Sequence, residues 1–518
     1  MKRFSPVALA GALALSALPA AAQDFTYAYS TDLRTLDPHA FNEGFTLGTL
    51  ANVYEGLVRR TESLEIVPAL AIGWELVEPT RWRFELRQDV RFHDGSTFSA
   101  EDVVFSLERA MSETANMGSR LAGVTEVTAV DDLTVEIVTE APNPILVNEF
   151  EFLLIMDRDW ALTNGAEVPA DLRGGESNFA STNANGTGAY RLTSRAPDVE
   201  TVAERHADWW GWAEAPGNAE RIVFRPIASD ATRTAALLSG DIDLAYPVPV
   251  QDIERLEAAE DIAVLAGPET RAMMLALDHA GDDNPLADRR VRQAIAQAID
   301  VGAIIEVVMR GRARPLALLA TPEIAGADRP EIEPPGYDPE AARDLLAEAG
   351  LPEDFTLGLV CPSGRYVNDE AVCQAITAML ERVGMAVALE TLPPSQWSQR
   401  MVNSDFDALL IGWAPGSLDS LNPLMTLAMS REAGGGAFNW GGYADAELDR
   451  LIAAARQETD PAERDRLIGE AWTIVAEDLP FIPLYQQYLA WGIADHIAVP
   501  QRPDDVLRWS AVTVAEPG

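Results

Sequence analysis

The stretch FELRQDVRFHDGSTFSAEDVVFSLERA, residues 84–110, brings a histidine, carboxylates and serines within a short reach of one another. At its start, Trp82, Phe84 and Leu86 alternate with charged residues, which predicts a half-buried strand. His93 then falls in a His-Asp-Gly-Ser turn, where the glycine can adopt positive φ. We therefore interpret His93 as a turn residue rather than a catalytic base.

The second half of the stretch predicts a helix with its own start signal. Ser99 and Asp102 have the spacing of a capping box, in which each side chain can bond the backbone N–H of the other residue. Val103, Leu107 and Ala110 contribute an apolar stripe. Nearly every polar residue here has a structural task, so we interpret the stretch as scaffold and assign no catalytic residue in it.

The N-terminus has the three parts of a secretory signal peptide. Two basic residues come first, residues 7–18 are apolar, and three consecutive alanines suit a signal peptidase. The apolar run falls short of the roughly 20 residues that span a bilayer. We predict that residues 1–22 are a signal peptide cleaved after Ala22. No cysteine follows the cut for lipid attachment, so we expect a soluble, exported protein.

Length and charge limit the possible functions. A chain of 518 residues is too long for one core, and two or three domains are expected. The formal net charge of −42 disfavours nucleic acid and anionic lipid as partners. We interpret the acidity as an aid to solubility and infer no cationic substrate from it.

Lysine is nearly absent, since Lys2, inside the predicted signal peptide, is the only one. A P-loop, a pyridoxal Schiff base and a Ser-x-x-Lys nucleophile pair each need a lysine, so the mature chain offers none of them. A Gly-x-Ser-x-Gly elbow is missing as well, and the five histidines are not spaced as metal ligands. We therefore expect no cofactor and no bound metal.

Cys361 and Cys373 are the two cysteines of the chain. In an exported protein a structural disulfide is favoured over a thiol nucleophile or a pair of metal ligands, which stay open as alternatives. Closing a loop of this size stabilises a fold by about 3 kcal/mol in the chain-entropy model.

Several segments, in the right order along almost the whole mature chain, resemble the extracytoplasmic solute-binding proteins of family 5. Members of that family are the dipeptide-, oligopeptide- and nickel-binding receptors of ATP-binding-cassette (ABC) importers. The strongest resemblance is that of WRFELRQDVRFHDGSTFSAEDVVFSLERA to the family's hairpin-and-helix segment. Further matching segments are TLDPHAFNEGFT, VYEGLVR, PALAIGWE, NGTGAYRL (185–192), DRRVRQAIAQAID (288–300), NWGGYADAELDRLIAAA and DLPFIPLYQQYLAWG.

The resemblance implies an α/β, two-lobed periplasmic-binding-protein fold, type II-like and of cluster C, with an extra subdomain in the first lobe. It places lobe I at residues 23–278, completed by 490–518, and lobe II at 279–489. Within lobe I, the extra subdomain is expected at about 61–184.

The residues themselves predict a β–α–β unit in lobe II. FTLGLV, from residue 355, predicts a strand, CPSGRYVND a loop before an amphipathic helix, and MAVALETL a returning strand, hence a parallel pair. A further buried strand, FDALLIGW, ends at Trp413. If these strands share a sheet, the loops at 361–368 and 414–423 open from its carboxyl edge, where ligands of α/β sheets tend to bind.

Arg365 is the first candidate for a ligand contact. It lies in the loop after the predicted strand, and an arginine fork matches a carboxylate in bidentate fashion. PSGRYVNDEAVC resembles the family segment whose arginine holds the peptide carboxylate in dipeptide receptors, which implies the same role for Arg365. A surface arginine or a structural salt bridge is the alternative.

The segment IGWAPGSLDSLNP, residues 411–423, resembles the one in which dipeptide receptors place an acid for the ligand's amino group. In this chain the aligned position is Gly416. Asp419 is the nearest acid and is our candidate amine anchor, with an Asx turn or a helix cap as the alternative. The departure weakens the expectation that the ligand is a dipeptide.

Five further residues are candidates for contact with the ligand. Trp413 and Trp440 can form aromatic walls, with buried packing as the alternative. Phe45 and Thr46 fall in the segment that lines the cleft in the family. Thr187, in Asn-Gly-Thr-Gly, can offer backbone and hydroxyl hydrogen bonds.

We therefore expect a monomeric periplasmic receptor, not an enzyme, that binds a short peptide or similar carboxylate-bearing solute and delivers it to the permease subunits of an ABC importer. Strands that cross between the lobes near Leu275–Leu277 and Leu489–Trp491 are hinge candidates, and lobe closure would trap the ligand. Oligosaccharides, opines and glutathione stay open as ligands, whereas nickel is disfavoured because no histidine lies in the expected cleft loops. The rival class is an exported hydrolase with a catalytic carboxylate pair, for which the chain carries no nucleophile signature.

Overall fold

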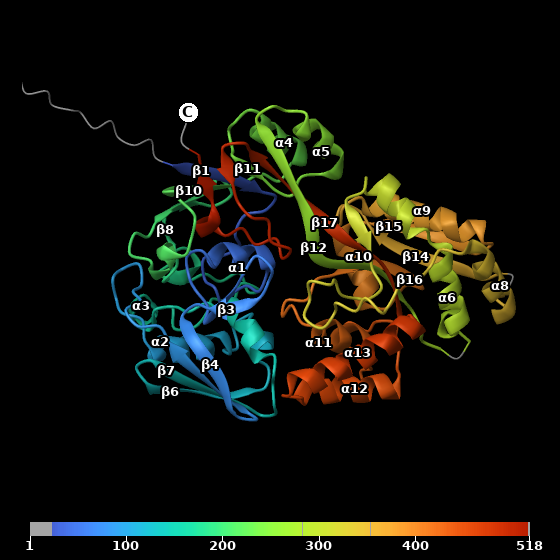
Figure 1. Ribbon diagram of the computed structural model, residues 1–518, viewed down its shortest axis with the longest axis horizontal. Helices are drawn as coiled ribbons and strands as arrows, with labels where there is room; N and C mark the ends of the chain where they lie inside the picture. Colours follow the sequence, from blue (N-terminus) through green and yellow to red (C-terminus); the bar gives the residue numbers. More distant parts are fainter. Residues whose placement is uncertain (1–22, 282, 353, 516–518) are drawn as a thin grey trace, which may run out of the picture.

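The computed structural model describes residues 23–281, 283–352 and 354–515. The predicted signal peptide lies outside the described residues. Figure 1 shows two lobes, with the N-terminal part of the chain on the left, joined by a long pair of strands. Within the described part of the chain, no helix combines the length and the apolar character needed to cross a membrane.

The two strands that join the lobes are β12 (Ile262–Leu277) and β17 (Phe481–Ala494), which pair antiparallel. The pairing has two blocks: the first joins Ile262–Pro268 to Tyr488–Ala494, and the second joins Ala272–Ala276 to Phe481–Gln486. The register shifts between the two blocks and again between Met273 and Met274. The strands belong to an eleven-stranded sheet of order β15-β14-β16-β12-β17-β11-β1-β10-β9-β8, with β13 (Ala313–Pro315) paired to β17. One sheet therefore runs through both lobes.

The predicted hinge segments lie on these two strands but do not face each other. Leu275 pairs with Ile482, whereas Trp491 pairs with Leu265 near the other end of the ribbon. Both register shifts lie between these two points, so the irregular part of the ribbon is 268–274 rather than either predicted segment.

The left-hand lobe is built around β1 (Asp24–Tyr29), which pairs parallel with β10 (Arg221–Pro226) and β11 (Leu244–Ala245). The remaining elements around it are α1 (Gly44–Leu50), β8 (Tyr190–Ala196), β9 (Glu200–Arg205), α4 (Asp230–Leu238) and α5 (Val250–Glu257). The C-terminal tail, with β18 (Ile497–Ala498) and β19 (Thr513–Val514), returns to this lobe. Trp509 from the tail packs against Tyr27 and Tyr190 in the core, with ring centroids 6.2 and 5.7 Å away.

A smaller four-stranded sheet lies below, in the order β4 (Ala71–Glu78), β5 (Arg81–Leu86), β7 (Thr134–Thr139), β6 (Val124–Asp131). Nearby are α2 (Ala100–Ala110), α3 (Arg158–Thr163) and the pair β2 (Val58–Arg60) and β3 (Ile66–Pro68). The strand and helix predicted from residues 84–110 are therefore confirmed, and the backbone N–H of Ser99 donates to Asp102 Oδ2 at 2.8 Å. His93 holds the turn to the segment 185–192, because its Nε2 lies 3.0 Å from the carbonyl oxygen of Gly188.

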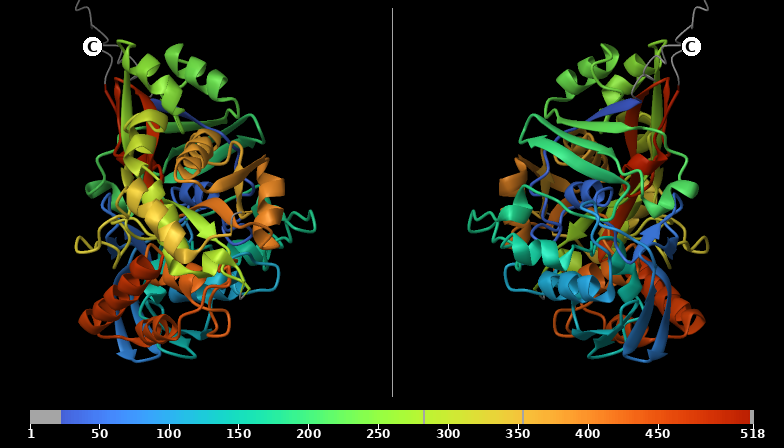
Figure 2. Two further views of the ribbon diagram at one scale, coloured as in Figure 1. Left: turned by 90° about the vertical axis from the view of Figure 1, so that its right-hand side faces the viewer. Right: turned by 90° about the vertical axis from the view of Figure 1, so that its left-hand side faces the viewer.

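The right-hand lobe contains the predicted β–α–β unit: β14 (Thr356–Pro362), α9 (Asp369–Arg382) and β15 (Ala386–Leu392), with the two strands parallel. The strand extends further than predicted, so Cys361 and Pro362 belong to β14 and not to the loop. Other elements are α6 (Arg289–Ala298), α7 (Val301–Ala303), α8 (Pro339–Ala349), α10 (Pro394–Val402), β16 (Ala408–Trp413), α11 (Leu421–Pro423), α12 (Ala446–Gln457) and α13 (Pro461–Asp478). In both views of Figure 2, α12 and α13 lie at the same end of the molecule as the four-stranded sheet.

Separate buried clusters of apolar side chains lie in the lobes, and one of them crosses the boundary that the sequence predicted. Leu64, from the N-terminal half, belongs to the same buried cluster as Leu421 and Trp472 of the right-hand lobe. The division of the chain at residues 278 and 490 stays a prediction.

The predicted disulfide is confirmed: Cys361 at the end of β14 is bonded to Cys373 on α9. Both residues are fully buried. The bond fixes the two ends of the loop that carries Arg365.

Replacing both cysteines, Cys361→Ala with Cys373→Ala, should lower the free energy of unfolding by about 3 kcal/mol, because the unfolded chain regains the entropy that the cross-link removes. Urea unfolding followed by circular dichroism measures the loss, and the wild-type protein unfolded in a reducing agent should show a similar one. A loss below about 1 kcal/mol would mean that the disulfide is not a main support of this lobe.

Candidate ligand-binding site

An aromatic cluster lies at the N-terminus of α1 in the left-hand lobe. Phe45 stacks on Tyr29 with ring centroids 3.8 Å apart, and Tyr29 contacts Tyr246 at 4.8 Å. Tyr246 in turn meets Trp491 of β17 at 5.0 Å. Since Phe45 and Tyr29 are only half-buried, this cluster offers an aromatic surface beside the strands that join the lobes.

Arg365 lies in the loop after β14 with its side chain exposed. Its Nε donates to the hydroxyl of Tyr366 at 3.0 Å, and its guanidinium lies 4.9 Å from the ring centre of Trp397. Among the described residues, no carboxylate forms an ion pair with it. Arg365 is therefore a cation held by aromatic neighbours with its charge uncompensated.

The loop around Arg365 is held rigidly by one carboxylate. Asp369, at the start of α9, is buried and accepts the backbone N–H groups of Gly364, Arg365 and Tyr366 at 3.2, 2.8 and 3.1 Å. Together with the disulfide, these bonds fix the position from which the arginine side chain leaves the backbone.

Two charged residues lie at the register shift of β12. Arg271 Nε donates to Glu269 Oε1 at 2.9 Å, and Gln487 Nε2 donates to Glu269 Oε2 at 2.8 Å. The Arg271 guanidinium also lies 5.9 Å from the ring centre of Tyr366. Arg271 and Arg365 thus approach the same tyrosine.

The tail adds a second acid to this region. Asp505 accepts a hydrogen bond from Trp491 Nε1 at 2.8 Å, and the backbone N–H of Thr270 donates to the nearby Pro503 carbonyl at 2.8 Å. Burial, followed by the charge of Glu269, raises the pKa of Asp505 well above its usual range.

The aromatic cluster and the charged residues come together at Tyr29. Burial raises the pKa of Tyr29, the charges of Asp505, Glu43 and Glu269 raise it further, and Arg271 opposes them. We call the whole group the interlobe site. Its members are Tyr29, Phe45, Tyr246, Glu269, Arg271, Arg365, Tyr366 and Asp505.

The two tryptophans predicted as walls of the site, Trp413 and Trp440, pack against the same phenylalanine in the structure. Trp413 is half-buried, and its Nε1 donates to Asn422 Oδ1 at 3.0 Å. Trp440 is buried, and both tryptophans contact Phe438, at 5.0 and 5.4 Å. Trp440 therefore packs inside the lobe in this structure, and contact of either tryptophan with a ligand stays a prediction.

Thr46 and Thr187 are both buried, and neither hydroxyl has a hydrogen-bond partner among the described residues. Thr187 lies between Gly186 and Gly188, two positions where an added Cβ would fall within 2.1 and 2.6 Å of backbone atoms of the segment 52–54. The Gly-Thr-Gly loop therefore packs closely against the residues after α1.

Asp419 is buried and forms an ion pair with Arg464 at 2.7 Å. In this conformation its charge is already compensated, so we do not retain it as the amine anchor. Gly416, at the aligned position, faces a cation: a Cβ built there would lie 3.6 Å from Nη2 of Arg120. That position is therefore poorly suited to hold a ligand's ammonium group.

Glu269, Arg271 and Asp505 were not predicted from the sequence. The only local signal is the charged pair in PETR, inside a strand that is otherwise apolar towards its end.

No cluster of three or more potential metal ligands occurs in the part of the chain that the structure describes.

Comparison with known proteins agrees with this geometry. Residues 65–435 match the family described as "Bacterial extracellular solute-binding proteins, family 5 Middle". The glutathione-binding protein GsiB of Escherichia coli (strain K12) is 28% identical over 499 residues, which cover 94% of this chain and 94% of that protein.

Solved structures give the same picture. The ABC transporter-associated periplasmic binding protein DppA from Helicobacter pylori, in complex with the peptide STSA, is 25% identical with a TM-score of 0.76, over 95% of this chain and 98% of that one. The ABC transporter substrate binding protein CtaP from Listeria monocytogenes, at 19% identity, has a TM-score of 0.84 over 96% and 100% of the two chains, which is a likeness of fold.

A two-lobed α/β fold with charged and aromatic residues gathered where the lobes join defines a solute-binding receptor. The chain belongs to family 5 of the bacterial extracellular solute-binding proteins, the periplasmic solute receptors of ABC importers. The family and the relatives named above are binding proteins rather than enzymes.

The raised pKa of Asp505 predicts a pH-dependent stability. The folded protein holds this proton more tightly than the unfolded chain does, so the carboxyl group lowers the stability in full above its raised pKa; the penalty shrinks as the pH falls below that pKa and is gone below the ordinary pKa of an aspartate. Asp505→Asn should therefore stabilise the ligand-free protein near pH 7 by about 1 to 3 kcal/mol, the usual cost of a poorly compensated buried polar group. Urea unfolding at several pH values measures the difference, which should shrink towards acidic pH.

The neighbouring residue supplies a matched control for this test. Asp504 forms an ion pair with Arg502 at 2.5 Å, so Asp504→Asn should destabilise the protein at neutral pH. An Asp505→Asn variant that is less stable than wild type near pH 7 would contradict the prediction.

Proposed function

We propose that this receptor binds a short peptide or a peptide-like solute that carries both a free carboxylate and a free amine, and that it delivers this solute to the permease subunits of an ABC importer. The observation that carries the proposal is Arg365, an exposed guanidinium without a carboxylate partner among the described residues. It occurs in a chain whose formal net charge is −42.

Arg365 suits a carboxylate for two reasons. Its planar fork can donate two parallel hydrogen bonds to one carboxylate. Its backbone is fixed by Asp369 and by the disulfide, so little ordering is needed when a ligand binds. Arg271 has its charge compensated by Glu269, which makes it the weaker candidate.

Asp505 suits the amine. It lies on the tail, accepts a hydrogen bond from Trp491 and acts on Tyr29 of the aromatic cluster. Burial, followed by the charge of Glu269, raises the pKa of Asp505, and a ligand ammonium group would stabilise its ionised form. Glu269 is already paired with Arg271, and Asp419 with Arg464, which is why we assign the amine to Asp505.

Two ligand classes follow from the relatives. A relative is named as a glutathione-binding protein, and a similar structure is described with a bound peptide. Glutathione and a short peptide both carry a free amine and at least one carboxylate, so both match the charges of the interlobe site.

The proposal includes the processing of the signal peptide and the oligomeric state of the mature receptor. We place cleavage of the signal peptide after Ala22 and propose that the mature receptor is monomeric in the periplasm. Since the chain offers no ATP-binding motif, the energy for transport must come from the partner subunits.

Arg365→Ala should weaken binding of glutathione, or of a short peptide such as Ser-Thr-Ser-Ala, by roughly thirty-fold to several thousand-fold. A lost charge-assisted pair costs about 2–5 kcal/mol, whereas an exposed arginine with no ligand contact costs at most about 1 kcal/mol. Titration calorimetry measures the dissociation constants. Arg343→Ala, at an exposed arginine on α8, is the control and should bind as wild type does.

The peptide amidated at its C-terminus completes the design. It should bind wild type weakly and lose little further affinity in Arg365→Ala, because the carboxylate that the arginine recognises is missing. If the free acid and the amide bind wild type equally well, or if Arg365→Ala loses less than about tenfold, Arg365 is not the carboxylate anchor.

The lobes should also close on the ligand. They already touch in this structure, where Arg60 Nη2 donates to the Ser417 carbonyl of the right-hand lobe at 3.2 Å. A ligand that contacts both lobes favours the closed population through its higher affinity for it. Small-angle X-ray scattering should show a smaller radius of gyration once ligand is added, whereas an unchanged radius at saturation would indicate a preformed site.

A further inference from the structure

The left-hand lobe contains a pocket of about 540 Å³ that is separate from the interlobe site. All of its lining residues come from the segments 51–69, 151–216 and 500–511. Its volume lies in the range of small-molecule sites. The right-hand lobe contributes none of the lining residues.

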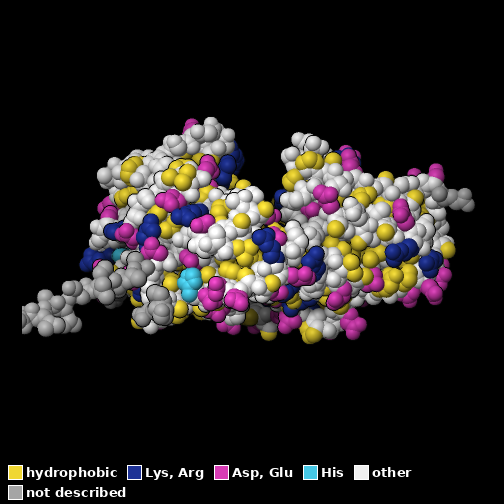
Figure 3. Space-filling model, turned by 90° about the horizontal axis from the view of Figure 1, so that it is seen from above, with side chains coloured by type: hydrophobic (Ala, Val, Ile, Leu, Met, Phe, Trp, Pro, Cys, Tyr) yellow, Lys and Arg dark blue, Asp and Glu magenta, His cyan; other side chains and the backbone are white. Residues whose placement is uncertain are grey.

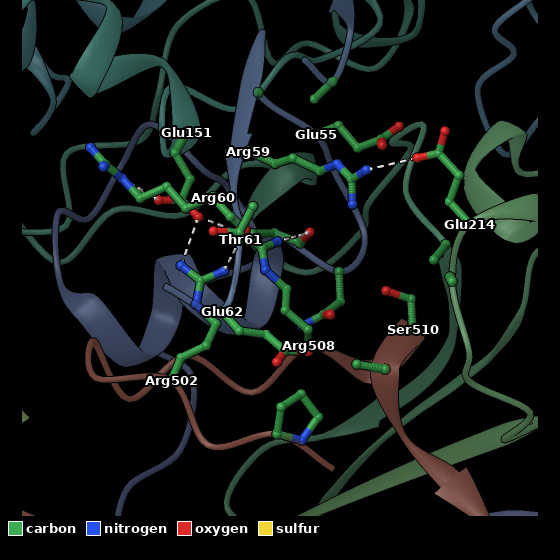
Figure 4. Close-up of a pocket in the computed structure, with 18 of the residues that line it drawn as sticks. Glu55, Arg59, Arg60, Thr61, Glu62, Glu151, Glu214, Arg502, Arg508 and Ser510 are labelled. Atoms are coloured by element: carbon green, nitrogen blue, oxygen red, sulfur yellow. Dashed lines mark hydrogen bonds and ion pairs between the residues drawn. The ribbon is translucent and has the colours of Figure 1, made fainter. Parts of the chain in front are cut away.

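Three arginines gather around one buried carboxylate in this pocket (Figure 4). Glu151 Oε1 accepts from Arg502 at 3.1 Å and from Arg508 at 2.6 Å, and its Oε2 lies 3.2 Å from Arg60 Nε. Asp504 provides a second carboxylate, on Arg502. Three guanidinium groups therefore share two carboxylates, which leaves an excess of one positive charge.

Arg508 is the guanidinium with room for a ligand. It uses Nη2 for Glu151 and Nη1 for the Ala51 carbonyl at 3.1 Å, which occupies two of its five N–H donors. Its side chain is 20% exposed, whereas that of Arg502 is 2% exposed. Burial and the neighbouring Arg502 lower the pKa of Arg508, as expected for a cation short of counter-charge.

The other carboxylates that line the pocket are occupied or lie at its rim. Glu55 accepts the indole N–H groups of Trp209 and Trp210, both at 3.1 Å, and burial raises its pKa. Glu214 pairs with Arg59 at 3.0 Å across the pocket, as Figure 4 shows. Glu62 is exposed. The cluster of arginines around Glu151 therefore keeps its excess of positive charge.

We propose that this pocket is a second binding site, which takes a small oxyanion, a phosphate or carboxylate group, on Arg508. The free N–H donors of Arg508 bind the anion, and Arg60 and Arg502 supply the field that favours it. The Trp209 side chain, which also lines the pocket, offers an apolar surface for whatever carries the anionic group. This inference does not rest on the ligand proposed for the interlobe site.

Calorimetric titration of the mature protein with inorganic phosphate and, separately, with succinate, both in chloride buffer, tests the site. At least one probe should bind with a saturable heat at a single site. Arg508→Gln, which shortens the donor and removes its charge, should weaken that binding by about tenfold or more. Binding of phosphate alone, of succinate alone or of both would each support the site and would identify the group it takes.

A rim variant and two controls complete the test. Ser63 is exposed and lines the pocket, so Ser63→Asp adds a negative charge without disturbing the core. It should weaken binding of the probe several-fold even if Arg508→Gln folds poorly.

The first control, Arg221→Ala, is matched to the rim residue Arg59, since the two side chains are 41% and 42% exposed and each pairs with one acid. It should leave the affinity unchanged, and so should Arg343→Ala, at an exposed arginine of α8. The proposal is overturned if neither probe gives a saturable heat, or if the affinity is the same in wild type, Ser63→Asp and Arg508→Gln.

Discussion

The antiparallel pairing of β12 with β17 is the constraint on which the rest of the structure depends, because it places both lobes on one sheet. A break in such a ladder leaves backbone groups that must find other partners. Here Gln486 Nε2 donates to the Glu269 carbonyl at 2.6 Å, and Thr270 N–H donates to the Pro503 carbonyl. These bonds give partners to two of the backbone groups at the break, where the charged side chains of Glu269 and Arg271 leave the strand.

The charge distribution of the molecule separates structural arginines from those available to ligands. Arg109 and Asp37 form an ion pair at 2.6 Å with both side chains fully buried, which fixes the N-terminal segment to α2. Removing one partner of such a pair lowers the free energy of unfolding by about 3–5 kcal/mol, so Arg109 stabilises the fold. Arg365, exposed and close to aromatic rings, has no such partner in the part of the chain that the structure describes. In Figure 3, acidic and basic side chains are interspersed over the surface, which is indented between the lobes, so the overall acidity does not decide what either site binds.

Local sequence patterns predicted the helices and strands well, but they could not predict contacts between residues that lie far apart in the sequence. The strand through Phe84, the helix after Ser99 and the parallel β14–β15 pair follow from periodicity and capping alone. The sequence could not show that Asp419 would meet Arg464, 45 residues further along the chain. Nor could it show that Asp505 would return beside Trp491 and Glu269, since the course of the tail depends on packing that no local motif encodes.

The arrangement of charge in the interlobe site also suggests why the acid expected near Gly416 can be missing. An acid there would face Arg120, whose Nη1 already pairs with Glu149 at 2.8 Å, and would be held by the protein rather than left for a ligand. Among the described residues, Asp505 on the tail, in the left-hand lobe, is an acid without an ion-pair partner, and Arg365 in the right-hand lobe is a cation without one. A ligand with an amine at one end and a carboxylate at the other would therefore engage both lobes at once. Its affinity for the closed form would exceed that for the open form by the free energy of the second contact, and this difference would drive the closure that we propose.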